Sequence, residues 1–328
     1  MQQRILGTTK IQISALGQGC ALFSEGYDKP NDADSLRTLE IAWDGGVTFF
    51  DTADAYGFGH NEELLSRFLR TPRPQIVVAT KVGLVRKPKA PPRIDNSPEY
   101  LRTACDQSLK RLGVEALDLL YLQRHDPEVP IAEVVGTLSN LVAAGKVRAL
   151  GLSEVSQKTL QEACQVHPIA AVQTEYSLWS RGPELGMLDT CKALGVTFVA
   201  YGPLGRGFFG GHVTDINELD PQDFRRFLPR FQPAALAQNR GLLPPLDAFA
   251  RQRHVSMPQI ALAWLLNKHT HVVPIPGSQQ SAHVLENIAA SELRLTPEEV
   301  MQLDGLMPPS AVIGARLPPA ALAGIEQP

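Results

Sequence analysis

Short apolar segments alternate with longer amphipathic segments along most of this chain. The short segments hold four to six apolar residues, as buried strands do, and the longer ones space their apolar residues three or four positions apart, as helices do. Eight strands are predicted, at 15–19, 47–50, 76–80, 117–122, 147–151, 169–173, 196–200 and 272–275. Helices are predicted at 32–44, 61–70, 131–144, 157–166, 185–194, 257–267 and 281–290, and another begins after Ser97, with Pro98 at its first position.

This alternation predicts an α/β fold with a parallel sheet. Eight units over roughly 280 residues match a closed (β/α)8 TIM barrel better than an open doubly wound sheet. The open sheet would carry a dinucleotide-binding fingerprint, and Gly17-Gln18-Gly19 lacks its third glycine. We therefore predict a single barrel domain over residues 1–328, with a short N-terminal hairpin at 4–6 and 11–13 and a peripheral tail at 308–328.

The segment after the seventh strand, 202–256, is the longest irregular part of the predicted barrel. Within it, residues 224–231 place three arginines among three phenylalanines. This stretch is predicted either to cover a cofactor or substrate or to be a packed surface loop, and the role of the loop 213–256 stays open.

Composition excludes several classes of partner. The chain has 328 residues and a net charge of -3, which argues against an electrostatic nucleic-acid interface. No apolar run approaches the roughly 20 residues that cross a membrane. The first ten residues contain no hydrophobic signal core, so we expect a cytoplasmic protein. The four cysteines lie far apart, which favours reduced, mostly buried thiols over a metal site or a disulfide framework.

Residues that directly follow the strands of such a barrel meet at one face and carry its function. Asp51 follows the second strand, and Tyr56 comes five positions later, before a turn bracketed by glycines. Lys81 follows the third strand and His125 the fourth. Each could have an ordinary role, as a turn cap, a rim residue, a solvated lysine or a loop histidine. Their position after three successive strands favours a shared site.

These four residues together suit the reduction of a carbonyl group. A free tyrosine has a pKa near 10, and a neighbouring lysine ammonium is expected to lower that pKa. A carboxylate would keep the lysine charged, so that Tyr56 could donate a proton to a carbonyl oxygen that gains negative charge. His125 could hydrogen-bond the same oxygen. Such a site lacks only a hydride, which a nicotinamide cofactor can supply.

Seven collinear segments then identify a resemblance. They read FDTADAYGFGHNEEL, ATKVG, DLLYLQRHDP, GKVRALGLSE, AVQTEYSLW, VAYGPLGRGFFGG and IPGSQQSAHVLENI. Together they resemble the aldo-keto reductases over roughly residues 4–305. The resemblance implies a (β/α)8 barrel that reduces aldehydes or ketones without a metal. It also implies that Tyr56 is the general acid, that Lys81 and Asp51 support it, and that His125 orients the substrate carbonyl.

The resemblance further implies a set of residues that bind NADPH, with NADH as the alternative. Ser153 and Gln173 match the positions that hold the nicotinamide carboxamide, and Tyr201 matches the aromatic residue that stacks on the ring. The loop with Leu204, Gly205 and Arg206 resembles the pyrophosphate cover. The segment that binds the adenosine phosphate and adenine corresponds to Gly277, Ser278, Gln279, His283, Glu286 and Asn287. Gln279 and Gln280 stand where many NADPH-dependent relatives place cations.

Two other functions remain as alternatives. A metal-dependent barrel hydrolase would need histidine ligands at the barrel mouth, but His269-Thr270-His271 enters the last strand at its other end. A cofactor-binding regulatory subunit with little turnover would keep the barrel and lose catalysis. The sequence leaves the substrate and the oligomeric state open.

Overall fold

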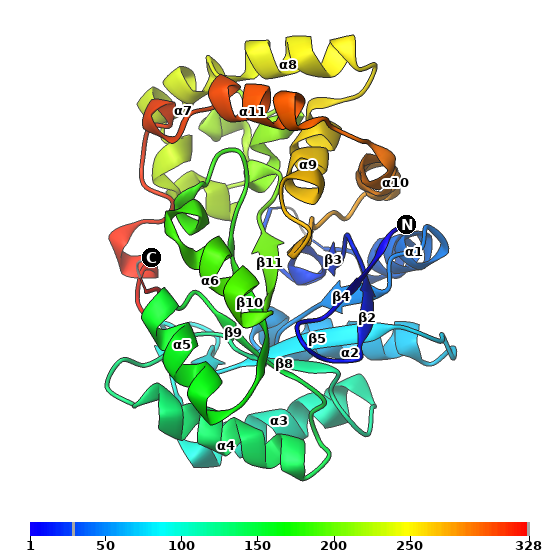
Figure 1. Ribbon diagram of the computed structural model, residues 1–328, viewed down its shortest axis with the longest axis vertical. Helices are drawn as coiled ribbons and strands as arrows, with labels where there is room; N and C mark the ends of the chain where they lie inside the picture. Colours follow the sequence, from blue (N-terminus) through cyan, green and yellow to red (C-terminus); the bar gives the residue numbers. More distant parts are fainter. Residues whose placement is uncertain (28–29, 327–328) are drawn as a thin grey trace.

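Eight parallel strands curl around one axis in the computed structural model of this protein (Figure 1). The structure describes residues 1–27 and 30–326. The strands follow one another around the sheet in chain order: β3 (Gln18–Gly19), β4 (Phe49–Asp51), β5 (Val77–Val82), β8 (Leu119–Leu122), β9 (Leu150–Ser153), β10 (Ile169–Glu175), β11 (Thr197–Tyr201) and β12 (Val272–Pro274). This order confirms the predicted (β/α)8 barrel.

The first and last strands close the ring through backbone hydrogen bonds. The N–H of Gly17 donates to the carbonyl of Pro274 at 2.9 Å, and Gly19 pairs with Gly277 in a parallel bridge. A Cβ atom on Gly19 would lie 2.8 Å from the Ile275 carbonyl oxygen, too close for any side chain. Glycine at this seam therefore lets the two strands approach.

Helices surround the ring, and most lie where the pattern predicts them. They are α1 (Asp32–Asp44), α2 (His60–Leu69), α3 (Pro98–Leu112), α4 (Ile131–Ala143), α5 (Gln157–Val166), α6 (Met187–Leu194), α9 (Met257–Lys268), α10 (Ser281–Ala289) and α11 (Pro297–Leu306). Ser97 caps α3 by accepting a hydrogen bond from the N–H of Tyr100, and Thr296 forms a capping box with Glu299 at α11. The cap at Ser97 explains why the start of α3 could be predicted.

Successive side chains of each strand point alternately into the barrel and towards the helices, so the strands separate two apolar layers. Phe49, Val77, Ala79, Leu119 and Tyr121 belong to the cluster inside the barrel, while the alternate residues of the same strands pack against the helices. Lys81 continues the inward series of β5, and the residue after β8 continues that of Leu119 and Tyr121. The alternation therefore delivers polar side chains to the mouth of a filled barrel.

Two helices occupy the stretch that was predicted to be irregular. These are α7 (Pro233–Arg240) and α8 (Leu243–Gln252), drawn near the top of Figure 1. Their prolines lie in the first helical turn, where a missing N–H costs nothing, so residues that resemble breakers begin these helices. The predicted hairpin is confirmed as β1 (Gln3–Ile5) and β2 (Gln12–Ser14), and a second one, β6 (Leu84–Val85) with β7 (Arg93–Ile94), was not predicted.

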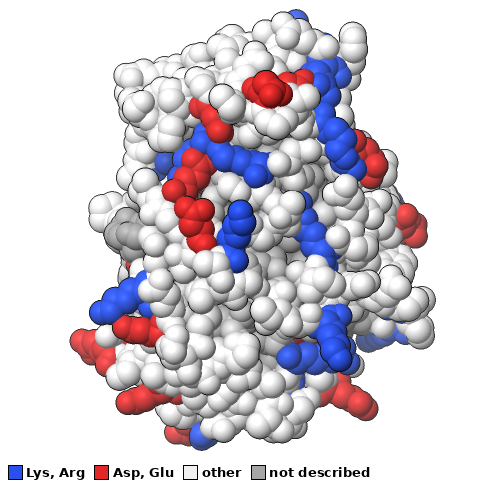
Figure 2. Space-filling model, in the orientation of Figure 1, with Lys and Arg blue, Asp and Glu red and all other residues white. Residues whose placement is uncertain are grey.

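The tail was expected to be peripheral, but its described residues contact α7 and the barrel mouth. Ile313 exchanges hydrogen bonds with the side chain of Asn239 on α7, and the N–H of Glu326 donates to the Glu154 carbonyl at 3.0 Å. In Figure 1 this red segment runs from α11 towards α5 and α6. Figure 2 shows basic and acidic side chains interspersed over the face of the molecule that it presents.

Candidate active site

The buried ammonium group of Lys81 joins the carboxylate of Asp51 to the phenol of Tyr56. Asp51 ends β4, and its side chain forms an ion pair with Lys81 Nζ. The same nitrogen donates to the carbonyl of Thr52 at 2.7 Å and lies 3.5 Å from Tyr56 Oη. Lys81 is 1% exposed and Asp51 2% exposed. The structure thus brings three of the four predicted catalytic residues together at the barrel mouth.

These contacts decide the protonation of the lysine and the tyrosine. Burial alone would lower the pKa of Lys81, but Asp51 and then Tyr56 outweigh it and hold that pKa above its usual value. Burial raises the pKa of the Tyr56 phenol, and the nearby Lys81 ammonium opposes but does not cancel this effect. The pKa of Tyr56 therefore lies above its usual value and not below it as expected. Tyr56 carries its proton at neutral pH, as a proton donor must.

Left-handed backbone places Tyr56 in its turn. Gly57 has φ of 56°, Phe58 of 56° and Gly59 of 98°, and α2 begins at the next residue. The N–H of Gly57 donates to Glu25 at 3.4 Å, and Glu25 is itself paired with Arg86 at 2.5 Å. The glycine-bracketed turn seen in the sequence thus connects β4 to α2 and positions the Tyr56 phenol beside Lys81.

His125, which was predicted to orient a substrate carbonyl, has both of its ring nitrogens bonded within the protein. Its Nδ1 lies 2.7 Å from Glu326 Oε1 in the tail, and its Nε2 lies 2.9 Å from the Val129 carbonyl oxygen. Two acceptors require a donor at each ring nitrogen, which is the imidazolium form. Burial opposes that charge, but Glu326 and Val129 outweigh it and raise the pKa of His125. Sequence reasoning missed the tail residue Glu326, which binds Nδ1, and the nearby Val129 carbonyl, which binds Nε2.

Gln123 is another polar residue that could bind a carbonyl group, because it faces the inside of the barrel. It directly follows β8, its N–H donates to the Val82 carbonyl at 2.7 Å, and alternation puts it on the inward side with Tyr121. Its side chain is 7% exposed, and its amide oxygen is buried with no hydrogen-bond partner among the described residues. A strand-by-strand count of inward positions would have found it.

The residues predicted to hold the nicotinamide lie at the ends of β9, β10 and β11. Ser153 ends β9 and lies 3.4 Å from an Arg124 nitrogen. Gln173 of β10 donates from Nε2 to the second oxygen of Asp51 at 2.7 Å, so it also holds the carboxylate that pairs with Lys81. Tyr201 ends β11 with its ring partly exposed. These three positions form one side of the mouth.

Two tail contacts near this side have no signal in the local sequence. Arg316 forms a bidentate pair with Glu154, with two distances of 2.7 Å, and its Nη1 lies 3.2 Å from Tyr201 Oη. Glu154 has a positive φ of 57° and is buried. Glu154 therefore serves the tail, and the sequence could not reveal a partner 162 residues away.

The predicted pyrophosphate cover is a tight turn after β11. The turn Gly205–Gly210 begins beside Leu204 and holds Arg206 at φ of 58°. Arg206 is paired with Glu175 at 2.7 Å. A cation is therefore present in this loop, but it is already neutralised by a carboxylate.

The predicted adenosine segment follows β12. Gly277 contacts the barrel seam, Ser278 accepts a hydrogen bond from the N–H of Gln280 at 3.1 Å, and Gln279 donates to the Leu22 carbonyl. On α10 the remaining predicted residues differ in exposure: His283 is exposed, Glu286 intermediate and Asn287 buried.

This arrangement fits a dinucleotide. The first N–H groups of α10 carry no side-chain cap from Gln280, and uncapped helix N-termini bind phosphate. The loops after the seventh and eighth barrel strands are where such barrels bind phosphate groups. Among the described residues, no group of three or more His, Cys, Asp or Glu side chains could hold a metal ion.

Comparisons with known proteins agree with this geometry. The sequence model of the Aldo/keto reductase family matches residues 15–308. Probable aldo-keto reductase 1 from Glycine max is 39% identical over 313 residues, covering 95% of this chain and 90% of its own. Aldo-keto reductase yakc from Schizosaccharomyces pombe, whose name carries NADP(+), is 37% identical over 315 residues, covering 94% and 93%.

Solved structures share the fold. The glycerol dehydrogenase AKR11B4 from Gluconobacter oxydans superposes with a TM-score of 0.86 at 28% identity, covering 97% of both chains. An aldo/keto reductase from Klebsiella pneumoniae in complex with NADP and acetate has a TM-score of 0.74 at 25% identity, covering 97% and 99%. Within the described part of this chain, no helix has the length and apolarity needed to cross a bilayer.

Replacing Glu326 with Gln should loosen the tail in a pH-dependent way. The pKa of His125 is raised on folding, so its ion pair with Glu326 stabilises fully below about pH 6.5 and is lost as pH rises through the raised value. We expect Glu326→Gln to lower the urea midpoint more at about pH 6 than at about pH 9. Equal losses at both pH values would contradict a charged pair, and His125→Gln should remove the difference.

Proposed function

Because this chain belongs to the aldo/keto reductase family and reduces carbonyl compounds with NAD(P)H, we propose that Tyr56 is the proton donor of the reaction. The observation that carries this proposal is the buried Lys81 ammonium, which lies between Asp51 and Tyr56. Aldehydes and ketones are thereby converted to alcohols.

The proton transfer follows from these contacts. As the carbonyl oxygen gains negative charge, the phenolic O–H of Tyr56 gives it a proton and leaves a phenolate. The Lys81 ammonium, 3.5 Å away, stabilises that phenolate, and Asp51 keeps the lysine charged. The reduced nicotinamide, when bound, supplies the hydride that goes to the carbonyl carbon.

We propose that Gln123, instead of His125, holds the carbonyl oxygen. His125 has both ring nitrogens bonded, whereas Gln123 lies inward, its amide oxygen has no partner among the described residues, and its amide nitrogen is the group that can donate. An amide N–H can donate to the carbonyl oxygen without changing charge between about pH 5 and 9, unlike a histidine.

NADPH is the proposed cofactor. Ser153, Gln173 and Tyr201 would hold the nicotinamide, and the turn after Leu204 would cover the pyrophosphate. The uncapped α10 N-terminus and His283 would receive the adenosine phosphate in place of a lysine or arginine. The NADP(+) in the name of the yeast relative and the NADP in the bacterial complex support this assignment.

We also propose a cytoplasmic location. The four cysteines are free thiols, and three of them are buried, which suits a reducing compartment.

Tyr56→Phe should abolish most turnover while cofactor binding persists. Loss of a general acid typically costs about 10²- to 10⁴-fold in kcat, because the developing alkoxide receives no proton. Reduction of 4-nitrobenzaldehyde is followed by the loss of NADPH absorbance, and binding by fluorescence quenching. Tyr100→Phe, which removes a phenol that bonds Asp54 at 3.2 Å outside the ion pair, is the control. Unchanged turnover in Tyr56→Phe would refute the assigned acid.

Gln123→Leu should lower kcat by about 10- to 100-fold, as expected when one donor to a developing oxyanion is lost. His125→Gln should leave kcat close to that of the parent, because His125 binds the tail. Steady-state kinetics across pH, with urea unfolding of both variants, separate catalysis from folding. The reverse pattern, with kcat lost only in His125→Gln, would return the role to the histidine.

NADPH should bind more tightly than NADH, but by a smaller margin than a lysine or arginine would give. Helix N-terminal charges contribute roughly 0.3–1 kcal/mol to binding a phosphate, equivalent to a factor of about two to five. Dissociation constants from fluorescence quenching measure the margin. Equal constants for the two cofactors would contradict the preference for NADPH.

A further inference from the structure

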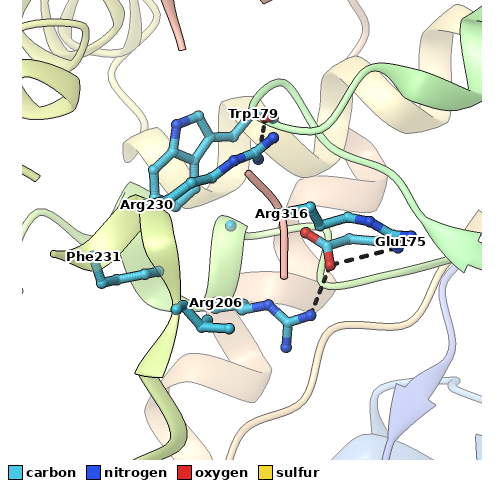
Figure 3. A pocket seen from close by; sticks show the side chains of 8 residues that line it. Glu175, Trp179, Arg206, Arg230, Phe231 and Arg316 are labelled. Carbon is cyan, nitrogen blue, oxygen red and sulfur yellow. Dashed lines mark hydrogen bonds and ion pairs between the residues drawn. The ribbon is translucent and has the colours of Figure 1, made fainter. Parts of the chain in front are cut away.

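A cavity of about 170 Å³ lies between the barrel mouth, the loop after β10 and the tail. Its wall includes Thr174, Ser180, Arg181, Arg230 and Arg316. A smaller, nearly filled pocket shares Glu175, Arg230 and Arg316 with it and is drawn in Figure 3. None of the residues assigned to proton transfer lines either space, and only the smaller pocket is lined by residues of the proposed pyrophosphate cover, Gly205 and Arg206.

One cation beside these cavities has no carboxylate partner. Arg316 is paired with Glu154 at 2.7 Å, Arg206 with Glu175 at 2.7 Å, and Arg181 with Glu184 at 2.5 Å. Arg230 has no carboxylate oxygen within 4.0 Å among the described residues (Figure 3). It donates only to neutral oxygens, namely the carbonyls of Trp179 and Gly314 and the Ser180 hydroxyl.

That charge is partly withdrawn from water. Burial lowers the pKa of Arg230, and its guanidinium lies 5.3 Å from the ring centre of Trp179. A partly buried charge that is bonded only to neutral groups is poorly compensated, and an anion in the adjoining cavity would compensate it.

Unpaired hydrogen-bond donors gather around the same two spaces. Thr174 Oγ1, Trp179 Nε1, Arg181 Nη1 and Arg206 Nε are buried without a partner among the described residues. Each of these residues lines one of the two cavities, and each atom can donate. The carboxylates in the walls are all paired with cations, so the unpaired donors lack a hydrogen-bond acceptor.

We propose that this cavity is an anion site in which Arg230 binds a carboxylate or phosphate group of a small molecule. Its volume suits a group of that size. Arg316 joins the cavity to the catalytic mouth, because it contacts both Glu154 and the Tyr201 hydroxyl. The anion is therefore either part of the carbonyl substrate, which rests on the proposed function, or a separate effector.

Binding is tested first on the full chain. Thermal unfolding and calorimetry at constant ionic strength are followed against inorganic phosphate and succinate. We expect both anions to bind and stabilise the parent and Arg240→Met, which removes an exposed arginine of α7. Arg230→Met should lose that binding, and Arg230→Lys, which keeps the charge, should retain a weakened form of it.

Kinetics separate the two sources of the anion. If the substrate carries it, Arg230→Met should raise the KM for 4-carboxybenzaldehyde by about tenfold or more and leave 4-nitrobenzaldehyde unaffected. If it is an effector, phosphate and succinate should bind in an Arg230-dependent manner while both aldehydes respond alike. The proposal would be overturned if anion binding did not depend on Arg230 and if Arg230→Met affected both aldehydes alike. Tyr56→Phe tested on 4-nitrobenzaldehyde judges the proposed catalysis independently of these outcomes.

Discussion

A lysine ammonium buried inside a barrel is the constraint on which the site depends. Lys81 cannot keep its charge in that position unless oxygens replace its water, and Asp51 and the Thr52 carbonyl do so. Both come from the strand beside its own, so the parallel pairing of β4 with β5 is a condition of the charge. The remaining side of the ammonium faces Tyr56. The contacts that stabilise the buried charge of Lys81 therefore also place that charge beside the proposed proton donor.

The tail sets the electrostatics of the opposite side of the mouth. Arg316 neutralises Glu154, and Glu326 neutralises His125, so two charged groups at strand ends are engaged by one C-terminal segment. Glu326 also accepts from the N–H of Ser156 at 2.8 Å and from Thr159 Oγ1 at 2.5 Å, and these contacts, with His125, hold its pKa at about 2 despite burial. His125, which was expected to orient the substrate, therefore holds the tail, and the role proposed for Gln123 replaces it. Arg230, which lies close to these contacts, has no carboxylate oxygen within 4.0 Å among the described residues and bonds only neutral oxygens.

Most of the fold could be predicted because its signals are local. Strand and helix periodicities, the caps at Ser97 and Thr296, and the glycines around Tyr56 each act within a few residues. Helices α7 and α8 were not predicted, and both carry proline in the first turn, where a proline is tolerated although it breaks a helix in its interior. Asp51, Tyr56 and Lys81 could be placed together because each follows or ends a strand of a barrel whose strands are neighbours in chain order.

The sequence alone determined the barrel, the register of inward residues along its strands and hence the ion pair under Tyr56. Only the tertiary structure decided the partners of His125, Glu154, Arg206 and Arg230, because those partners lie far along the chain and pair through side-chain geometry that no periodicity records. It also decided that the phenol of Tyr56 keeps its proton, since burial acts on the pKa more strongly than the neighbouring charge. The local sequence pattern determines the direction in which a side chain points. Packing against distant segments determines which groups that side chain contacts.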